Sequence, residues 1–379
     1  MASLRDIRVT LYTAVAAILV LIGFFTLGHG PSLQSLHRPI PSPASSNTVT
    51  PAFRPAPSAV AAPVATHSAI PETKKPGEEK LAYVTWLSST VVGKDSEKLD
   101  EDVYFIGTRI LIWQLLHYQK TKTHGIDVVV VVTPDVSESR RERLRKDGAI
   151  VRPIEFVHGK NDEWLHPKEN RWNDIMSKLR VWEMEEYSRI LMLDGDMILM
   201  HPLDGIFKDP AAQIAPRLHN ASNPEDEPDI PDDYLLASIG EVAGADHQYP
   251  PDWDHGLKKH GYFCAGFFML KPSKKIFDYY TGILDIKDRF NPEYMEQNLL
   301  NYAHRWDGPM PWKELSYTWN IRSVNDHDLD EGVVSMHEKW WEDPLSKSDR
   351  VRGIFKSMRW QMEGYYLARD EFQAQLSYD

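Results

Sequence analysis

Residues 189–202 read RILMLDGDMILMHP, and this stretch places Asp194 and Asp196 inside an almost unbroken apolar run. Charged side chains are almost never buried without a partner, so the two carboxylates require one. The apolar residues before Asp194 predict a buried strand, and open α/β sheets bind ligands beyond the carboxyl ends of such strands. Gly195 permits close approach of a ligand or of neighbouring backbone. The pattern favours a metal ion as the partner, with a buried arginine as the alternative.

Spacing alone does not single out this pair. The Asp-x-Asp pattern occurs five times, at 100/102, 194/196, 252/254, 326/328 and 328/330. The other four lie in polar surroundings, where solvated charge is the simplest interpretation. Two carboxylates at the end of a buried strand suit Mn²⁺ or Mg²⁺, which can bridge protein oxygens and a diphosphate. Such a bridge matters here because the sequence has no G-x-G-x-x-G after its first strand and no Walker A motif.

Strand and helix signals alternate from residue 81 onward. LAYVTW (81–86) and DVVVVVT (127–133) are typical of buried strands, and an apolar helix is expected between them, from about 104 to 118. A charged helix (137–148), a strand (149–154), a helical spacing (174–188) and the strand 189–193 follow in that order. This alternation predicts an α/β fold with a mostly parallel central sheet flanked by helices, forming a single domain over residues 80–379.

The N-terminal region has a different composition. Arg5 and Arg8 precede an uncharged apolar run, Val9 to Leu27, which as a helix would cross about 30 Å of hydrocarbon. We expect residues 1–8 to be a cytosolic tail, 9–28 a transmembrane signal-anchor and 29–79 a disordered stem rich in Pro, Ser and Ala. A cleaved signal peptide is the alternative, but its apolar region is usually shorter. Anchor, stem and globular body in this order are the layout of a single-pass type II membrane protein with a lumenal body.

Charge and cysteine content narrow the classes of function. A net charge of −12 argues against a general nucleic-acid binder, which needs a basic surface. The one cysteine, Cys264, allows no intramolecular disulfide. Homodimerisation is left open by the sequence.

Motifs from residue 81 to residue 341 resemble glycosyltransferase family 8, the glycogenin and galactinol synthase group. They follow the chain as YVTWL, TPDVS, DGAIVRPIEFV, SKLRVWE, LDGD, FCAGFFMLKP, EQNLLN and TWNI. The LDGD and EQNLLN forms are closer to the galactinol synthase branch. The resemblance implies a GT-A (nucleotide-diphospho-sugar transferase) fold and a retaining, Mn²⁺-dependent transfer from a UDP-sugar. Because galactinol synthases lack an anchor, the anchor expected here favours a glycan or glycoconjugate acceptor. The resemblance and the anchor together predict a Golgi membrane protein whose residues 80–379 form a lumenal catalytic domain.

The resemblance also implies roles for individual residues near the diphosphate. Asp194 and Asp196 would hold the metal together with His337, which lies in GVVSMHEKWW. Lys178, in SKL, would lie near the diphosphate or the donor sugar, and a solvated helix lysine is its plain alternative. Three further residues match positions near the uracil: Thr85, Trp86 and Tyr104. Trp86 could equally belong to the core.

Other matches surround the reacting sugar. Glu296 and Gln297 correspond to an acidic-Gln pair beside the anomeric carbon, and either could act on the face opposite the leaving group. Cys264 and Gly266 belong to CAG, where the family usually has N-A-G or N-S-G. Cys264 therefore takes the place of a sugar-binding asparagine, or is simply a small buried residue. Asn320, in TWNI, matches a position on the acceptor side.

The clearest departure from the family follows His337. The family commonly reads H-x-x-G-x-x-K-P-W, and its lysine clamps the leaving diphosphate, whereas this chain reads HEKWWED. Lys339, Lys347 or Arg350 could supply that charge, which is worth several kcal/mol in comparable sites. Without it, the chain would be a weak or inactive sugar-nucleotide-binding scaffold. A phosphatase with an Asp-x-Asp motif is less favoured, because its pair would follow the first strand of the domain.

Overall fold

The computed structural model describes residues 79–376, apart from 89–97, 222, 340 and 342–347. These residues belong to one compact unit, Thr73–Asp379. The expected tail and anchor, and all of the expected stem but its last residue, lie outside the described residues. Among the residues that are described, no helix has the length and apolar character needed to span a bilayer.

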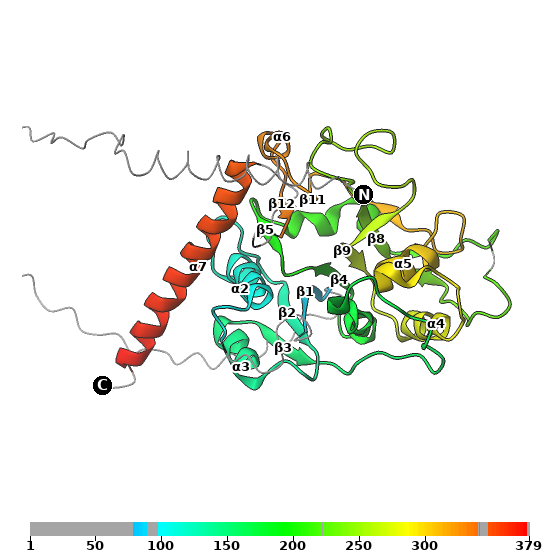
Figure 1. Cartoon of the computed structure of the whole chain (residues 1–379), viewed down its shortest axis with the longest axis horizontal. Coiled ribbons are helices and arrows are strands. Elements are labelled where there is room, and N and C mark those ends of the chain that lie inside the picture. The colour runs from blue at the N-terminus through cyan, green and yellow to red at the C-terminus, as the bar shows by residue number, and fades with distance from the viewer. Residues whose placement is uncertain (1–78, 89–97, 222, 340, 342–347, 377–379) are drawn as a thin grey trace, which may run out of the picture. The chain divides into compact units, whose positions relative to one another are not determined.

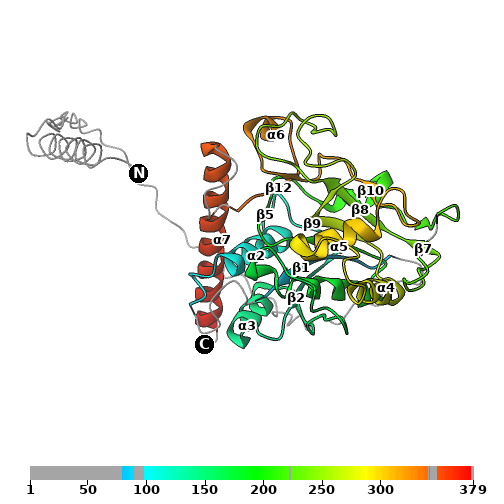
Figure 2. The same cartoon turned by 45° about the vertical axis from the view of Figure 1, so that its right-hand side comes forward.

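A seven-stranded sheet forms the centre of this unit, in the order β10-β8-β9-β4-β1-β2-β3 (Figures 1 and 2). Its strands are β1 (Leu81–Leu87), β2 (Asp127–Val132), β3 (Ile150–Pro153), β4 (Arg189–Leu193), β8 (Leu236–Gly240), β9 (Phe263–Leu270) and β10 (Lys313–Glu314). Only β9 runs antiparallel to its neighbours, β4 and β8. The predicted α/β fold with a mostly parallel sheet is therefore confirmed.

Helices cover both faces of this sheet. One face carries α2 (Val103–Leu116) and α3 (Glu138–Asp147), and the other carries α4 (Lys274–Leu284), α5 (Met295–Ala303) and a 3₁₀ helix, η2 (Ile175–Glu183) (Figure 1). Side chains alternate between the two faces of a strand, so β1 serves both cores. Ala82 and Val84 pack toward η2, α4 and α5, while Tyr83 and Leu87 pack toward α2 and α3.

The segment expected to be a helix over 174–188 is instead the shorter η2. The amide of Ser177 donates to the carbonyl of Asp174, and that of Met184 donates to Val181, three residues back in each case. Six of the nine residues of η2 are buried, and η2 lies against α4 and α5. Packing on this side, rather than helix propensity, therefore sets its winding.

A second, three-stranded sheet brings the end of the chain back to the LDGD loop. It consists of β5 (Met197–Leu199), β11 (Ile321–Arg322) and β12 (Ser335–His337), in the order β11-β12-β5. In its register Met197 lies opposite His337, so His337 lies next to Asp196. The long helix α7 (Asp349–Leu376) packs beside α2 in both views (Figures 1 and 2).

The remaining short elements connect these layers. They are η1 (Asn170–Trp172), η3 (Asp204–Lys208), η4 (Pro210–Ala212), β6 (Ala215–Pro216), β7 (Asp233–Tyr234), η5 (Pro292–Tyr294) and α6 (Asp326–Asp330).

Candidate active site

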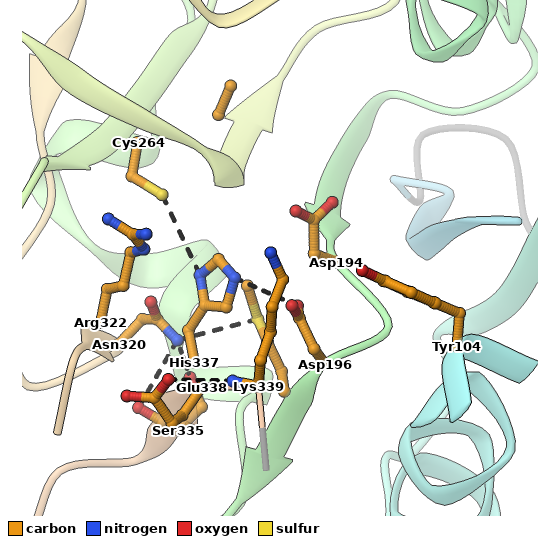
Figure 3. A network of polar contacts seen from close by, with 12 residues as sticks. Tyr104, Asp194, Asp196, Cys264, Asn320, Arg322, Ser335, His337, Glu338 and Lys339 are labelled. Atoms are coloured by element: carbon orange, nitrogen blue, oxygen red, sulfur yellow. Dashed lines mark hydrogen bonds and ion pairs between the residues drawn. The ribbon is translucent and has the colours of Figure 1, made fainter. Parts of the chain in front are cut away.

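Two carboxylates and an imidazole converge where β4 ends. Asp194 and Asp196 follow β4, and His337 is the last residue of β12. Each offers one ligand atom, and these atoms all lie within 4.8 Å of one another. His337 Nε2 is 3.1 Å from Asp196 Oδ1, and Figure 3 shows the imidazole between Asp196 and Cys264. Two carboxylate oxygens and one imidazole nitrogen form a donor set that suits Mn²⁺ or Mg²⁺.

The electrostatics of this group follow from its burial. Burial alone would lower the pKa of His337, but the adjacent Asp196 carboxylate raises it well above its ordinary value. For Asp196, burial raises the pKa, but the charges of His337 and Lys339 outweigh this and hold it below its usual range. The two side chains therefore form an ion pair. A divalent cation bound here would replace the proton on His337 as the partner of Asp196.

Glycines make room for this arrangement. A Cβ added at Gly266, on β9, would lie 2.4 Å from His337 Cε1 and 2.9 Å from Asp194 Oδ2. A Cβ at Gly107, on α2, would lie 2.6 Å from the carbonyl oxygen of Gly195. The LDGD loop is thus packed directly against a strand and a helix that present no side chain at the contact points. A side chain at Gly266 would displace His337 and Asp194, so the glycine allows the ligand atoms to converge as a small cation requires.

Lys178 links the metal-binding group to the sugar-side residues. Its Nζ is 2.6 Å from Asp194 Oδ1 and 3.2 Å from Glu296 Oε1, and its side chain is only 3% exposed. Burial would lower the pKa of Lys178, but the two carboxylates raise it, so the ammonium stays charged. Burial raises the pKa of Glu296 to about 7, although Lys178 opposes this shift. Lys178 is therefore not the solvated helix lysine of the plain alternative.

Gln297 uses both ends of its amide within the protein. Its Oε1 accepts a hydrogen bond from the amide of Ala265 at 3.0 Å, and its Nε2 donates to the hydroxyl of Tyr262 at 2.9 Å. These bonds attach the start of α5 to the start of β9. Glu296, one residue earlier, is 4% exposed and lines the same pocket.

Of the three residues matched to the uracil, two line the pocket and one does not. Trp86 and Tyr104 line the pocket, and Tyr104 accepts a hydrogen bond from Arg171 Nη1 at 2.9 Å. Lys178 Nζ lies 5.7 Å from the centroid of the Trp86 ring, so this partly buried tryptophan faces the site as well as the core. Thr85 is buried within β1, between β2 and β4, and does not line the pocket.

Cys264 and the residues after His337 complete the wall. Cys264 Sγ lies 4.0 Å from His337 Nδ1, and burial raises the pKa of the thiol, which keeps it neutral. Lys339 lines the pocket, and its side chain extends past His337 toward the side that holds Asp194 (Figure 3). Of the alternatives for a diphosphate cation, Arg350 pairs with Asp330 on the surface, and Lys347 lies outside the described residues. Asn320 is buried and donates to Ser335 Oγ rather than lining the pocket.

Most of the predicted site residues face one pocket of about 450 Å³, and those that line it are Trp86, Tyr104, Lys178, Asp194, Gly195, Asp196, Cys264, Gly266, Glu296, Gln297, His337 and Lys339. Its wall also contains residues that sequence reasoning missed, among them Arg171, Glu241, Lys258, Arg322 and Glu338. Glu241 follows β8 and pairs with Arg322 of β11. The two residues are distant in the sequence and come together only in the folded chain. No local pattern marks either residue, and no signal in the sequence could have found the pair.

The other Asp-x-Asp pairs correct one expectation. Asp102 and Asp328 are buried rather than solvated, because each caps a helix. Asp102 caps α2 and pairs with Arg140, while Asp328 completes a capping box with Asn325. Among the described residues, the pair 194/196 is the one that a third potential ligand joins.

Comparison with known proteins places the chain in a family. The chain matches no family model. It is 30% identical over 275 residues to an uncharacterised protein of Schizosaccharomyces pombe, covering 64% of this chain and 70% of that protein. The chain belongs to the same family as this S. pombe protein. It is also 28% identical over 200 residues to galactinol synthase 1 of Solanum lycopersicum, covering 51% of this chain and 54% of that enzyme.

The homologues of the chain thus include galactinol synthases, and the chain is a glycosyltransferase. It spans about half the length of the tomato enzyme. Together with the sheet order, this relationship confirms the predicted GT-A fold class. Among solved structures, the galactosyltransferase LgtC in complex with donor and acceptor sugar analogues is 15% identical, with a TM-score of 0.45, covering 74% of this chain and 95% of that one.

Proposed function

We propose that the chain transfers a hexosyl or N-acetylhexosaminyl group from a UDP-sugar to a glycan or glycoconjugate, with retention of anomeric configuration. The observation that carries this proposal is the group of Asp194, Asp196 and His337, with ligand atoms within 4.8 Å of one another at the wall of a large pocket. The donor set suits Mn²⁺, with Mg²⁺ as the alternative. When bound, the ion would offset the charge of the departing diphosphate.

The chain's own residues have separate tasks in this proposal. Trp86 and Tyr104 line the pocket and would contact the uracil. Glu296 is the better candidate for the face opposite the leaving group, because both amide ends of Gln297 are already bonded within the protein. Lys178 fixes the position of the Glu296 carboxylate, which would stabilise positive charge developing at the anomeric carbon.

We also propose that the enzyme is a type II protein of the Golgi membrane. The apolar run Val9 to Leu27, its basic N-terminal flank and the Pro-rich residues after it support this topology. Protease treatment of sealed microsomes should leave the catalytic domain intact and remove only a tag placed before residue 9. Digestion of the catalytic domain in sealed vesicles would contradict the proposal.

A donor screen with the purified full-length chain tests the activity. UDP-glucose, UDP-galactose and UDP-GlcNAc would each be supplied with Mn²⁺, and UDP release and product anomeric configuration would be measured. Release of UDP from one of them, abolished by chelation and restored by Mn²⁺, is the expected result. A product of inverted configuration would contradict the retaining assignment.

Variants of two Asp-x-Asp pairs provide the matched comparison. Asp196→Asn should abolish Mn²⁺-dependent UDP binding, because it removes a charged oxygen ligand from the buried group. Asp254→Asn changes the same motif at an exposed position and should bind UDP as the wild type does. Both can be followed by calorimetry. Unchanged UDP binding by Asp196→Asn would show that the metal group is wrongly assigned.

The second candidate is a non-catalytic scaffold that binds sugar nucleotides, and the departure after His337 favours it. It predicts Mn²⁺-dependent UDP binding without turnover of any UDP-sugar. Lys339 lines the pocket, so a cation remains available to the diphosphate, and this supports an active enzyme instead.

A further inference from the structure

The segment after His337 is held at both of its described ends. The amide of Glu338 donates to the carbonyl oxygen of Asp196 at 3.3 Å, which attaches the segment to the LDGD loop. Trp341 packs edge-on against the ring of Tyr104, with ring centroids 4.8 Å apart and planes at 65°. Such aromatic pairs stabilise a contact beyond the area they bury. The stretch from His337 to Trp341, with three residues between them, is therefore attached to the rest of the site at both ends.

This tether has a direct consequence for Lys339, which lies midway along it. Two extended residues span at most about 7 Å, so the Cα of Lys339 stays within that distance of both His337 and Trp341. The amide of Lys339 is further bonded to Glu338 Oε1 at 3.0 Å. The ammonium group extends beside the metal-binding residues, as Figure 3 shows. The backbone of Lys339 is therefore kept close to the metal-binding residues on one side and to Tyr104 on the other.

Trp341 is bound to the same helical turn that supports the aspartate loop. Gly107 lies one turn after Tyr104 on α2, and a Cβ there would meet both the Gly195 carbonyl and, at 3.6 Å, the Trp341 ring. Tyr104 is itself fixed by Arg171. Tyr104 and Lys339 line the pocket, whereas Trp341 does not. A residue so placed would act on a ligand through its neighbours rather than by contact.

We propose that Trp341 is a positioning residue, which holds Lys339 where it can contact the diphosphate of the donor. The short tail would then supply, two residues after His337, the cation that the resemblance places six residues after it. This inference rests on the proposed function, because it requires a diphosphate at the metal group.

Binding of UDP and of UMP to the full-length chain in the presence of Mn²⁺ tests it. Lys339→Ala should weaken UDP binding about ten- to a hundredfold, the usual range for one hydrogen bond to a charged group. It should affect UMP much less, because UMP lacks the second phosphate. Trp341→Ala should show the same selective loss, and Trp341→Phe should restore most of the affinity, since a phenyl ring can still meet Tyr104.

A double variant separates positioning from direct contact. Once Lys339 is absent, Trp341→Ala should cause no further loss of UDP affinity, so the two effects should not add. Trp360→Ala, on a tryptophan of α7 that is 66% exposed, is the control and should bind UDP normally.

Additive losses, or equal losses for UDP and UMP, would overturn the inference, as would normal UDP binding by Trp341→Ala. These outcomes leave the proposed function standing, because the wild type still binds UDP with Mn²⁺. A wild type that binds no UDP at all would overturn the proposed function and this inference with it.

Discussion

Lys178 is a buried cation in contact with two carboxylates, and its removal should be costly. Lys178→Met keeps most of the volume but leaves Glu296, 4% exposed, without its cation. Breaking a buried pair from one side usually costs about 3–5 kcal/mol, because an uncompensated charge remains. We expect a loss of that order in the free energy of unfolding, measured by urea denaturation near pH 8.

Two further variants test this explanation. Removing both charges with Lys178→Met and Glu296→Gln together should recover part of the loss, since the amide needs no cation. Lys274→Met removes a lysine from an exposed pair with Asp278 and should leave stability nearly unchanged. If Lys178→Met were as stable as Lys274→Met, the pairing of Lys178 with Glu296 would have no energetic weight.

Single residues also show which features of the site can be predicted from the sequence. The grouping of Asp194, Asp196 and His337 could be predicted from motifs, because a strand end and the resemblance to the family mark them. The contact between Lys178 and Glu296 joins residues 118 positions apart, so no local pattern contains it. Asp102 and Asp328 were expected to be solvated, but helix capping buries them, and capping depends on where the helix begins in three dimensions.

At the scale of elements, β9 sets the space available at the metal group. The strand is hydrogen-bonded to β4 on one side and to β8 on the other, so its backbone cannot shift without breaking these bonds. Gly266→Ala should therefore push a methyl group against His337 and Asp194. We expect Mn²⁺-dependent UDP binding to fall at least tenfold while the protein still folds, because the imidazole can rotate away from the clash.

A second glycine provides the comparison for this prediction. A Cβ at Gly353, on α7, would meet nothing within 4 Å. Gly353→Ala should bind UDP normally and be about 0.5–1 kcal/mol more stable, since alanine favours a helix. Calorimetry and thermal unfolding of both variants would decide the matter. Normal UDP binding by Gly266→Ala would mean that the site tolerates a larger residue there.

Strands with long apolar runs were predictable, and short ones were not. β1, β2 and β4 are marked by continuous apolar sequence, because both of their faces are covered. β5, β11 and β12 have three residues or fewer, and they exist only because they pair with one another. That second sheet carries His337 to Asp196. The sequence marks His337 as a candidate ligand after a short apolar stretch, but it does not predict the pairing of β12 with β5 that places His337 beside Asp196.

At the scale of the whole molecule, we expect a buried histidine to make the stability of the domain depend on pH. His304 is fully buried, with Nδ1 2.7 Å from the carbonyl oxygen of Met310 and Nε2 2.5 Å from the hydroxyl of Tyr280. With Nδ1–H donating to Met310, Nε2 accepts from Tyr280, and the ring is satisfied in its neutral form. Burial lowers the pKa of His304 to about 4, although the bond to Met310 opposes the shift.

The sign of the effect follows from linkage. In the unfolded chain the pKa of a histidine is about 6.5, so between pH 6.5 and 4 the unfolded state binds a proton that the folded state does not. The stability contributed by neutral His304 is complete above about pH 6.5 and is lost as the pH falls toward 4. One proton changes the free energy of unfolding by at most about 1.4 kcal/mol per pH unit.

Urea denaturation of the wild type and of His304→Gln between pH 4.5 and 7 measures this pH dependence. The variant should lose stability less steeply on acidification. Parallel pH profiles, with the variant merely displaced to lower stability, would mean that His304 is not the group that titrates on unfolding.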